Sequence, residues 1–121
     1  MQIAFDKSEE SVVKSKGLGI FSGCVKKFNY ELKPPLNGWA KLKLSNNSET
    51  KNKYSFLQDK RVYFTHSYYC QTEKRDEIAY IKHNNFMYSA LTIKDNFIGL
   101  QFHPEKSGPA GIEILEQILS N

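Results

Sequence analysis

Short runs of β-branched and aromatic residues, separated by Gly, Pro and polar residues, recur through the middle of this 121-residue chain. Such runs fit the pleated, half-buried surface of a β-sheet, and the residues between them favour turns. The polar triplet at 94–96 joins two of these runs and predicts a hairpin. We expect strands near residues 24–28, 38–44, 61–65, 87–93 and 97–102.

Helices are expected to close both ends of the chain. Residues 1–12 predict a helix, although no Ser, Thr, Asp or Asn precedes them as an N-cap. Pro109 stands where proline begins helices, and residues 45–53 hold no apolar side chain and predict a surface loop. The apolar face expected to pack on the sheet consists of Ile112, Leu115, Ile118 and Leu119. Strands in the middle and helices at the ends predict an α/β domain.

Composition predicts one small domain that is soluble and cytoplasmic. No apolar run approaches the roughly 20 residues of a membrane helix, no signal-peptide pattern is recognisable, and two cysteines cannot form a disulfide framework.

The net charge is +4, but 15 of the 17 basic residues are Lys, spread over predicted loops and strand ends. Nucleic-acid binding favours Arg and clustered charge, so we expect no nucleic-acid partner and no membrane partner, and rank nucleic-acid binding last among the functions.

Residues 99–107 place chemically active residue types at the end of a strand. An apolar strand leads to His103, Pro104 restricts the backbone, and Glu105 follows two residues after the histidine. Catalytic groups in open α/β sheets gather at the carboxyl ends of strands, and a carboxylate beside an imidazole can fix its tautomer and stabilise its protonated form. The same pattern is typical of a structural, hydrogen-bonded histidine, so both interpretations stay open at this point.

The remaining polar residues give no metal or cofactor signal. The three His and two Cys do not stand at zinc-ligand spacing, and no Gly-rich phosphate loop precedes a helix. We expect His66 to be structural and His83 to lie in an exposed turn. The sequence therefore predicts no metal site and no cofactor.

Residues 101–107, Gln-Phe-His-Pro-Glu-Lys-Ser, resemble the C-terminal signature of class I (triad) glutamine amidotransferases, and the Lys-Ser ending is similar to that of the glutaminase subunit of imidazole glycerol phosphate synthase. Four other segments resemble parts of the family pattern and follow one another in the order that the family has. These segments are Met1-Gln2 with residues 5–10, residues 17–28, Gly38-Trp39 and residues 62–69. Residues 44–59 and 70–88 match poorly. The resemblance implies the C-terminal part of such a domain, an open mixed sheet with flanking helices, as a single truncated domain over residues 1–121.

The resemblance also implies a reaction, the hydrolysis of the side-chain amide of glutamine to glutamate and ammonia through a cysteine thioester. In that reaction His103 is the general base and acid, and Glu105 orients it. The glutamine contacts that the resemblance implies are Gln2 and the backbone around Ser67 and Tyr68. The implied partner is a (β/α)₈-barrel cyclase subunit, which uses the ammonia in histidine biosynthesis within a heterodimer.

The nucleophile is the main departure from the family pattern. The family's cysteine lies in a Gly-x-Cys-x-Gly elbow directly before the Met-Gln pair, so the resemblance implies that the chain starts just after it and is inactive as given. Cys24 enters a predicted strand, and Cys70 has no glycine nearby, so we expect both to be structural thiols rather than substitutes.

A second departure surrounds Trp39, which the resemblance places at the surface facing the synthase partner. Leu36 and Ala40 stand where the family usually has His and Asn. Two alternatives therefore remain, a paralogue that supplies ammonia to surface-sugar amination and a truncated, non-catalytic remnant. Burial of Trp39 in the core is an equally open interpretation of this residue.

Overall fold

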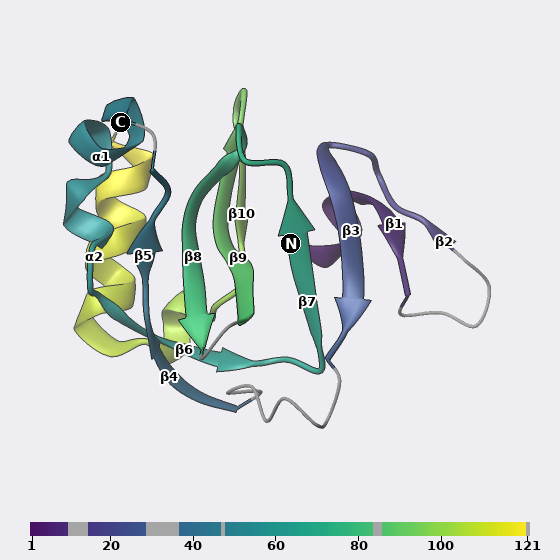
Figure 1. Ribbon diagram of the computed structural model, residues 1–121. Coiled ribbons are helices and arrows are strands. Elements are labelled where there is room, and N and C mark those ends of the chain that lie inside the picture. Colours follow the sequence, from purple (N-terminus) through teal and green to yellow (C-terminus); the bar gives the residue numbers. More distant parts are fainter. Residues whose placement is uncertain (10–14, 29–36, 47, 84–85, 121) are drawn as a thin grey trace.

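The computed structural model describes residues 1–9, 15–28, 37–46, 48–83 and 86–120, and it confirms the α/β class (Figure 1). The strands are β1 (Phe5–Ser8), β2 (Ser15–Lys16), β3 (Phe21–Lys27), β4 (Asn37–Lys41), β5 (Lys43–Leu44), β6 (Arg61–Thr65), β7 (Tyr68–Thr72), β8 (Glu77–His83), β9 (Phe86–Lys94) and β10 (Phe97–Leu100). The helices are α1 (Ser48–Lys53) and α2 (Gly108–Leu119), with short 3-10 turns η1 (Gln2–Ala4), η3 (Ser55–Leu57) and η4 (Pro104–Lys106).

The strands form one large mixed sheet and one small ribbon. The large sheet has eight strands in the order β2-β1-β3-β7-β9-β8-β5, and β10 pairs with β9 as the predicted hairpin. β1 and β3 run parallel, whereas the other neighbouring strands of this sheet pair antiparallel in the part of the chain that the structure describes. β4 and β6 pair separately as a two-stranded ribbon, which runs along the lower edge of the molecule in Figure 1.

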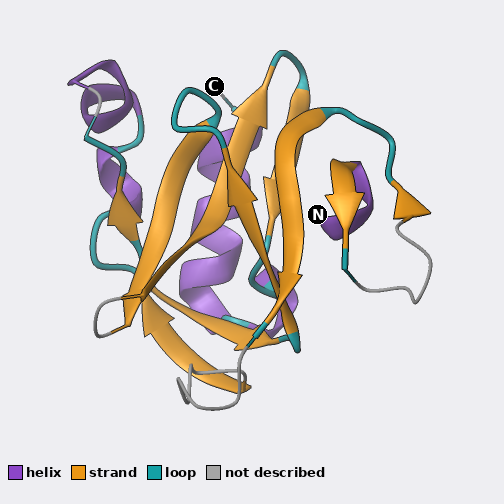
Figure 2. Ribbon diagram, turned by 45° about the vertical axis from the view of Figure 1, so that its right-hand side comes forward, coloured by secondary structure: helices purple, strands orange, loops and turns teal. Residues whose placement is uncertain are grey.

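Helix α2 lies behind the strands in the view of Figure 2 and closes one side of the main core. Its buried side chains are Ile114 and Ile118, at 0% and 6% exposure. Gly111 is also buried on this side of the helix. The backbone approaches the carbonyl oxygen of Pro104 so closely here that a Cβ would collide with it. This close approach fixes the rotation of the helix about its axis.

The predicted apolar face of α2 is therefore partly wrong. Ile118 is buried as expected, but Ile112, Leu115 and Leu119 are 59%, 37% and 75% exposed. The helix turns the stripe that contains Gly111 toward the core, and these three larger side chains lie outside that stripe.

The helix predicted over residues 1–12 is wrong for residues 1–9, which form η1 and β1, while residues 10–12 lie outside the described part of the chain. Ile3, Ala4 and Phe5 are consecutive rather than spaced by three or four, so a helix could bury only part of this apolar set. In the extended conformation Phe5 is 1% exposed and packs on Phe21, with 5.7 Å between the ring centroids.

The strand predictions in the middle of the chain are confirmed in outline. β6, β9 and β10 fall where expected, β3 begins three residues early, and the run at 38–44 divides into β4 and β5. Strands β2, β7 and β8 were not predicted, and His83 ends β8 rather than lying in a turn.

The loop predicted at 45–53 is also wrong in part, since residues 48–53 form α1. Glu49 stands in its first turn and Lys51 and Lys53 in its last turn, an order that favours the helix dipole. Within the described residues, no helix is long and apolar enough to cross a membrane.

Candidate active site

The backbone of His103 is fixed between strand β6 and the start of α2. Its N–H donates to the carbonyl of Tyr63 at 2.9 Å, and the two residues form an isolated antiparallel bridge. The hydroxyl of Ser107 donates to the carbonyl of His103 at 2.6 Å and accepts the N–H of Tyr63 at 3.0 Å. Two hydrogen bonds to its own backbone, and a third between Tyr63 and Ser107, therefore hold the histidine in place shortly after β10.

The imidazole of His103 is paired with the carboxylate of Glu105. Nδ1 lies 2.8 Å from Oε1 of Glu105, whose side chain is 64% exposed on η4. The backbone N–H of Glu105, followed by the hydrogen bond with His103, lowers the pKa of this carboxyl. An ionised carboxylate only accepts hydrogen bonds, so Nδ1 carries the proton in the neutral ring and Nε2 is left as the basic atom.

His66 stacks on His103, with 4.8 Å between ring centroids and 12° between ring planes. Burial, followed by the positive charge of His103, lowers the pKa of His66. His66 is therefore neutral at neutral pH, so its ring can stack on the imidazole of His103 when that imidazole takes up a proton.

A cavity of about 300 Å³ is lined by Met1, Gln2, Ile3, His66, Leu100 and Gln101, and the ring of His103 stacks on that of His66. The side-chain amides of Gln2 and Gln101 both point to the carbonyl of Tyr68, at 3.3 and 3.5 Å. The cavity therefore combines an aliphatic wall with two amide groups.

Three buried polar atoms in this region have no hydrogen-bond partner among the residues that the structure describes, and they are Nε2 of His66, Nε2 of His103 and Oε1 of Gln101. A buried polar atom without a partner costs about 1–3 kcal/mol. Three further atoms of this kind, on Asp76, Tyr88 and Thr92, belong to described residues that do not line the cavity. His66 and Gln101 line the cavity, so a polar ligand bound there would be close to two of these atoms, which favours a binding site over a purely structural histidine.

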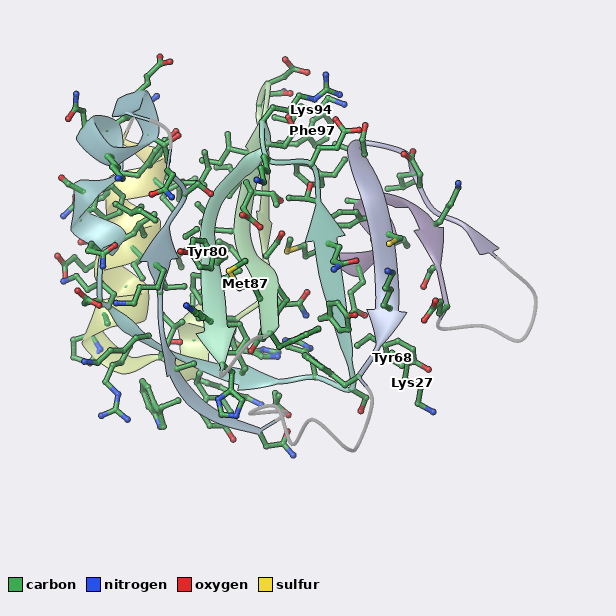
Figure 3. All side chains as sticks on the ribbon, in the orientation of Figure 1. Lys27, Tyr68, Tyr80, Met87, Lys94 and Phe97 are labelled. Atoms are coloured by element: carbon green, nitrogen blue, oxygen red, sulfur yellow. The ribbon has the colours of Figure 1, made fainter. Side chains whose placement is uncertain are left out.

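The structure brings together some of the predicted site residues and leaves others apart. His103 and Glu105 are in contact, and Gln2 and the carbonyl of Tyr68 meet at the cavity. Figure 3 shows Tyr68 beside Lys27, its cross-strand neighbour, at the junction of β3 and β7. Ser67 is exposed, and its carbonyl accepts the N–H of Phe28 at 3.1 Å.

Trp39 is not a core residue, because it is 47% exposed on β4. Its ring meets that of Tyr63 edge to face, with centroids 5.8 Å apart. The second departure from the family pattern involves Leu36 and Ala40. Ala40 packs against the main core and does not lie on the exposed face of β4, whereas Leu36 lies outside the described residues.

Sequence reasoning missed the roles of His66, Gln101 and Ser107. A glutamine inside the otherwise apolar run 98–102 was a usable signal, because a buried amide needs partners. The stacking of His66 on His103 had no local signal, since it depends on β6 and the segment after β10 lying side by side.

Neither cysteine is placed as a nucleophile for His103. Cys24 lies half-buried in β3, and Cys70 is fully buried in β7, as expected for structural thiols. Nε2 of His103 has no hydrogen bond to any residue in the described ranges, which include both cysteines. Among these residues, no group of three or more His, Cys, Asp or Glu side chains is placed to hold a metal ion.

Comparison with known proteins gives one family. The model of the class-I glutamine amidotransferase family matches residues 1–121. The "Imidazole glycerol phosphate synthase subunit HisH" of Carboxydothermus hydrogenoformans is 39% identical over 118 residues, which cover 98% of this chain and 57% of that relative. The proteins of the same name from Trichodesmium erythraeum and Lactococcus lactis subsp. lactis are 40% and 38% identical, covering 99% and 98% of this chain and 56% and 57% of their own lengths. The chain thus spans somewhat more than half the length of these relatives.

Proposed function

The chain belongs to the class-I glutamine amidotransferase family, and we propose that it supplies the histidine and the carboxylate of a glutaminase active site. Membership confirms the resemblance that the motifs indicated. In this proposal, residues 1–121 form the C-terminal part of one amidotransferase domain. The observation that carries it is the 2.8 Å contact between Nδ1 of His103 and Glu105, which leaves a buried Nε2 without a hydrogen-bond partner among the described residues.

The proposed reaction begins when Nε2 of His103 takes the proton of a cysteine thiol, and the thiolate attacks the amide carbon of glutamine. Glu105 stabilises the imidazolium that forms, and the imidazolium then gives its proton to the departing ammonia. Water, activated by the same imidazole, hydrolyses the thioester and releases glutamate. The nucleophile is the cysteine that the family carries directly before the Met-Gln pair, rather than Cys24 or Cys70.

Substrate contacts are proposed at the cavity. The amides of Gln2 and Gln101 converge on the carbonyl of Tyr68, and Oε1 of Gln101 remains free to accept a hydrogen bond from glutamine. The backbone around Ser67 and Tyr68 forms the adjacent wall in this proposal. No cofactor takes part in the reaction.

The proposed partner is a synthase subunit of the (β/α)₈-barrel type in a heterodimer, because the relatives are named as subunits of imidazole glycerol phosphate synthase. The ammonia would then serve histidine biosynthesis in the cytoplasm, and Trp39 would contact the partner. Ala40 faces the core, so its departure from the family's Asn does not alter the exposed face of β4 and does not favour another partner.

Glutamate release tests this function most simply in a protein that joins residues 1–121 to the cysteine-bearing segment of the Carboxydothermus hydrogenoformans relative. We expect glutamine hydrolysis that increases with the synthase subunit present, and a loss of about 10³-fold or more in kcat for His103→Ala. His83→Ala is the matched control, because His83 ends β8 and does not line the cavity. Full activity in His103→Ala, or none in the joined protein, would contradict the proposal.

A further inference from the structure

The contact between His103 and Tyr63 departs from the usual pattern of an antiparallel bridge. In a hydrogen-bonded antiparallel pair, two residues exchange two bonds, each from the N–H of one residue to the carbonyl of the other. Here only one bond is direct, from the N–H of His103 to the carbonyl of Tyr63 at 2.9 Å. In place of the second, the hydroxyl of Ser107 accepts the N–H of Tyr63 at 3.0 Å and donates to the carbonyl of His103 at 2.6 Å. A side-chain oxygen is therefore inserted into the bridge.

The second direct bond is missing because the chain turns immediately after His103. Pro104 begins the 3-10 turn η4, and within that turn the carbonyl of His103 accepts the N–H of Lys106 at 3.1 Å. The N–H of Tyr63 then needs another acceptor, since an N–H inside the fold that lacks one is destabilising. Ser107 directly follows η4, and its side chain supplies that acceptor.

Ser107 is itself held by η4 and α2. Its backbone N–H donates to the carbonyl of Pro104 at 3.0 Å, and its carbonyl accepts the N–H of Gly111 at 3.4 Å. A Cβ at Gly111 would lie only 2.9 Å from the Cβ of Ser107, so the first turn of the helix packs tightly on the serine. The serine is 2% exposed. The inserted hydroxyl is thus a fixed part of the fold and not a mobile surface group.

We propose that Ser107 is a positioning residue for His103, because its hydroxyl sets the spacing between the backbone of the histidine and strand β6. This inference rests on the proposed function, in which Nε2 of His103 accepts the proton of a thiol. Without the hydroxyl, the N–H of Tyr63 loses its acceptor, or the backbone of His103 moves to bond it directly. Either change leaves the imidazole less accurately placed, and a displacement of about 1 Å can slow an enzymatic reaction about 100-fold.

The groups proposed to contact glutamine are not part of this link. They are the amide of Gln2 and the backbone around Tyr68, while the imidazole keeps its own partner, Glu105. A misplaced histidine should therefore lower kcat, whereas KM for glutamine and the proton on Nδ1 stay as they are in wild type. A serine with a purely structural role would lower stability without this division between kcat and KM.

The test compares Ser107→Ala and Ser107→Cys in the joined protein, with the synthase subunit present. In Ser107→Ala we expect kcat for glutamine hydrolysis to fall by about 10- to 100-fold, with KM within about twofold of wild type. The thiol of Ser107→Cys donates and accepts hydrogen bonds weakly, so its kcat should lie between those of wild type and Ser107→Ala. The ¹⁵N NMR spectrum of the His103 imidazole should show a proton on Nδ1 of the neutral ring in all three proteins.

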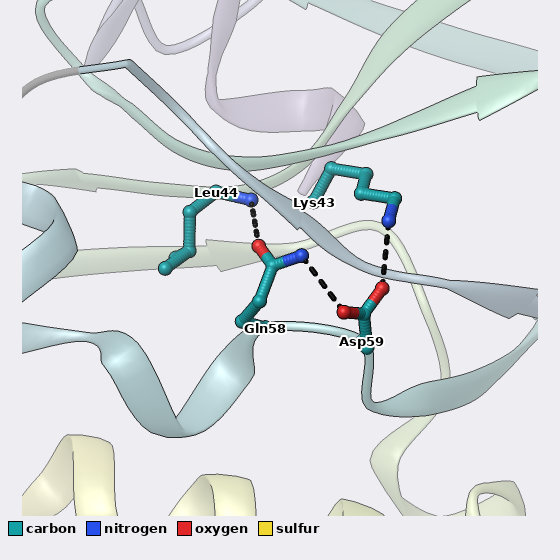
Figure 4. Close-up of polar contacts among 4 residues, drawn as sticks. All are labelled: Lys43, Leu44, Gln58 and Asp59. Atoms are coloured by element: carbon teal, nitrogen blue, oxygen red, sulfur yellow. Dashed lines mark hydrogen bonds and ion pairs between the residues drawn. The ribbon is translucent and has the colours of Figure 1, made fainter.

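Two control variants remove comparable hydrogen bonds elsewhere. Ser89 is 1% exposed, and its hydroxyl accepts the N–H of Thr72 at 3.3 Å and donates to Glu77 at 2.5 Å. Ser89→Ala therefore removes the same atom from an equally buried position. Gln58 accepts the N–H of Leu44 at 3.2 Å (Figure 4), and Gln58→Ala breaks this link shortly before β6 begins. Both controls should keep kcat within about twofold of wild type.

A second measurement does not depend on activity. Hydrogen exchange of the Tyr63 amide, relative to other amides of β6, should be about tenfold faster or more in Ser107→Ala and unchanged in Ser89→Ala, because only the first variant removes its acceptor.

An unchanged exchange rate in Ser107→Ala, or a kcat equal to that of wild type, would overturn the inference while leaving the proposed function intact. An equal loss of kcat in Ser107→Ala and Ser89→Ala would also overturn it, because the effect would then not depend on the bridge. A joined wild-type protein that hydrolyses no glutamine would instead contradict the proposed function, and this inference with it.

Discussion

At the scale of single residues, the site depends on the difference between two imidazoles in contact. Nδ1 of His103 is paired with a carboxylate and its Nε2 has no hydrogen-bond partner among the described residues, while His66 is partly buried against this ring. Burial and the neighbouring charge lower the pKa of His66, so the pair can hold one proton on His103 without a second charge stacked on it. This arrangement suits a group that must gain and lose a proton during turnover.

The lowered pKa of His66 predicts a pH-dependent stability. Between this pKa and the value near 6.5 in the unfolded chain, the unfolded state binds more protons, so stability rises with pH. The stabilising contribution is fully present above about pH 6.5 and is lost as the pH falls through the lower, folded pKa. In His66→Phe, which keeps a stacked ring without a proton, we expect a smaller loss of stability between about pH 7 and pH 5.

Urea denaturation of both proteins at several pH values measures this difference. At about pH 8, where His66 is neutral, any offset between the two proteins reports packing alone. An identical decline toward low pH in wild type and His66→Phe would show that His66 does not titrate as the structure implies.

At the scale of elements, the position of His103 depends on how closely α2 approaches η4, the turn that directly follows this histidine. Gly111 faces the carbonyl of Pro104, and Pro104 directly follows His103. Gly111→Ala would force these elements apart, and we expect a loss of about 1–3 kcal/mol in the free energy of unfolding together with reduced glutamine hydrolysis. Glu116→Ala, an exposed substitution on the same helix, should change stability by less than about 0.5 kcal/mol.

Chemical denaturation measures the effect of Gly111→Ala on stability, and glutamate release from the joined protein described above measures its effect on activity. A variant as stable and as active as wild type would mean that α2 can shift without disturbing His103. A stable but inactive variant would instead show that the helix positions the histidine without contributing much to folding.

Local patterns predicted the elements whose signals are contained in one short segment. The strand before His103 and the start of α2 at Pro109 were recognisable because each signal, an apolar run and a helix-starting proline, is contained in a few consecutive residues. The pattern failed at β7, where Tyr69 and Cys70 are adjacent and both buried, so no clean alternation is visible.

The candidate site was predictable only in part for the same reason. His103 and Glu105 are two residues apart, whereas the stack with His66 and the amides around the carbonyl of Tyr68 join segments that are distant in the chain. Contacts of this kind arise from sheet topology, which periodicity does not specify.

At the scale of the whole molecule, Tyr63 links the candidate site to the exposed tryptophan of the β4–β6 ribbon. Its ring packs against that of Trp39, and its backbone bonds both His103 and Ser107. The proposed chemistry and the proposed partner contact of Trp39 therefore share strand β6.

The most direct test of the central claim, that Nε2 of His103 is the basic atom of the site, is the ¹⁵N NMR spectrum of its imidazole. We predict a proton on Nδ1 and an unprotonated Nε2 in the neutral ring, and a shift of the proton toward Nε2 in Glu105→Gln, whose amide can donate to Nδ1. A proton on Nε2 in the wild-type protein would contradict the account, because that atom could not then accept a proton from a thiol.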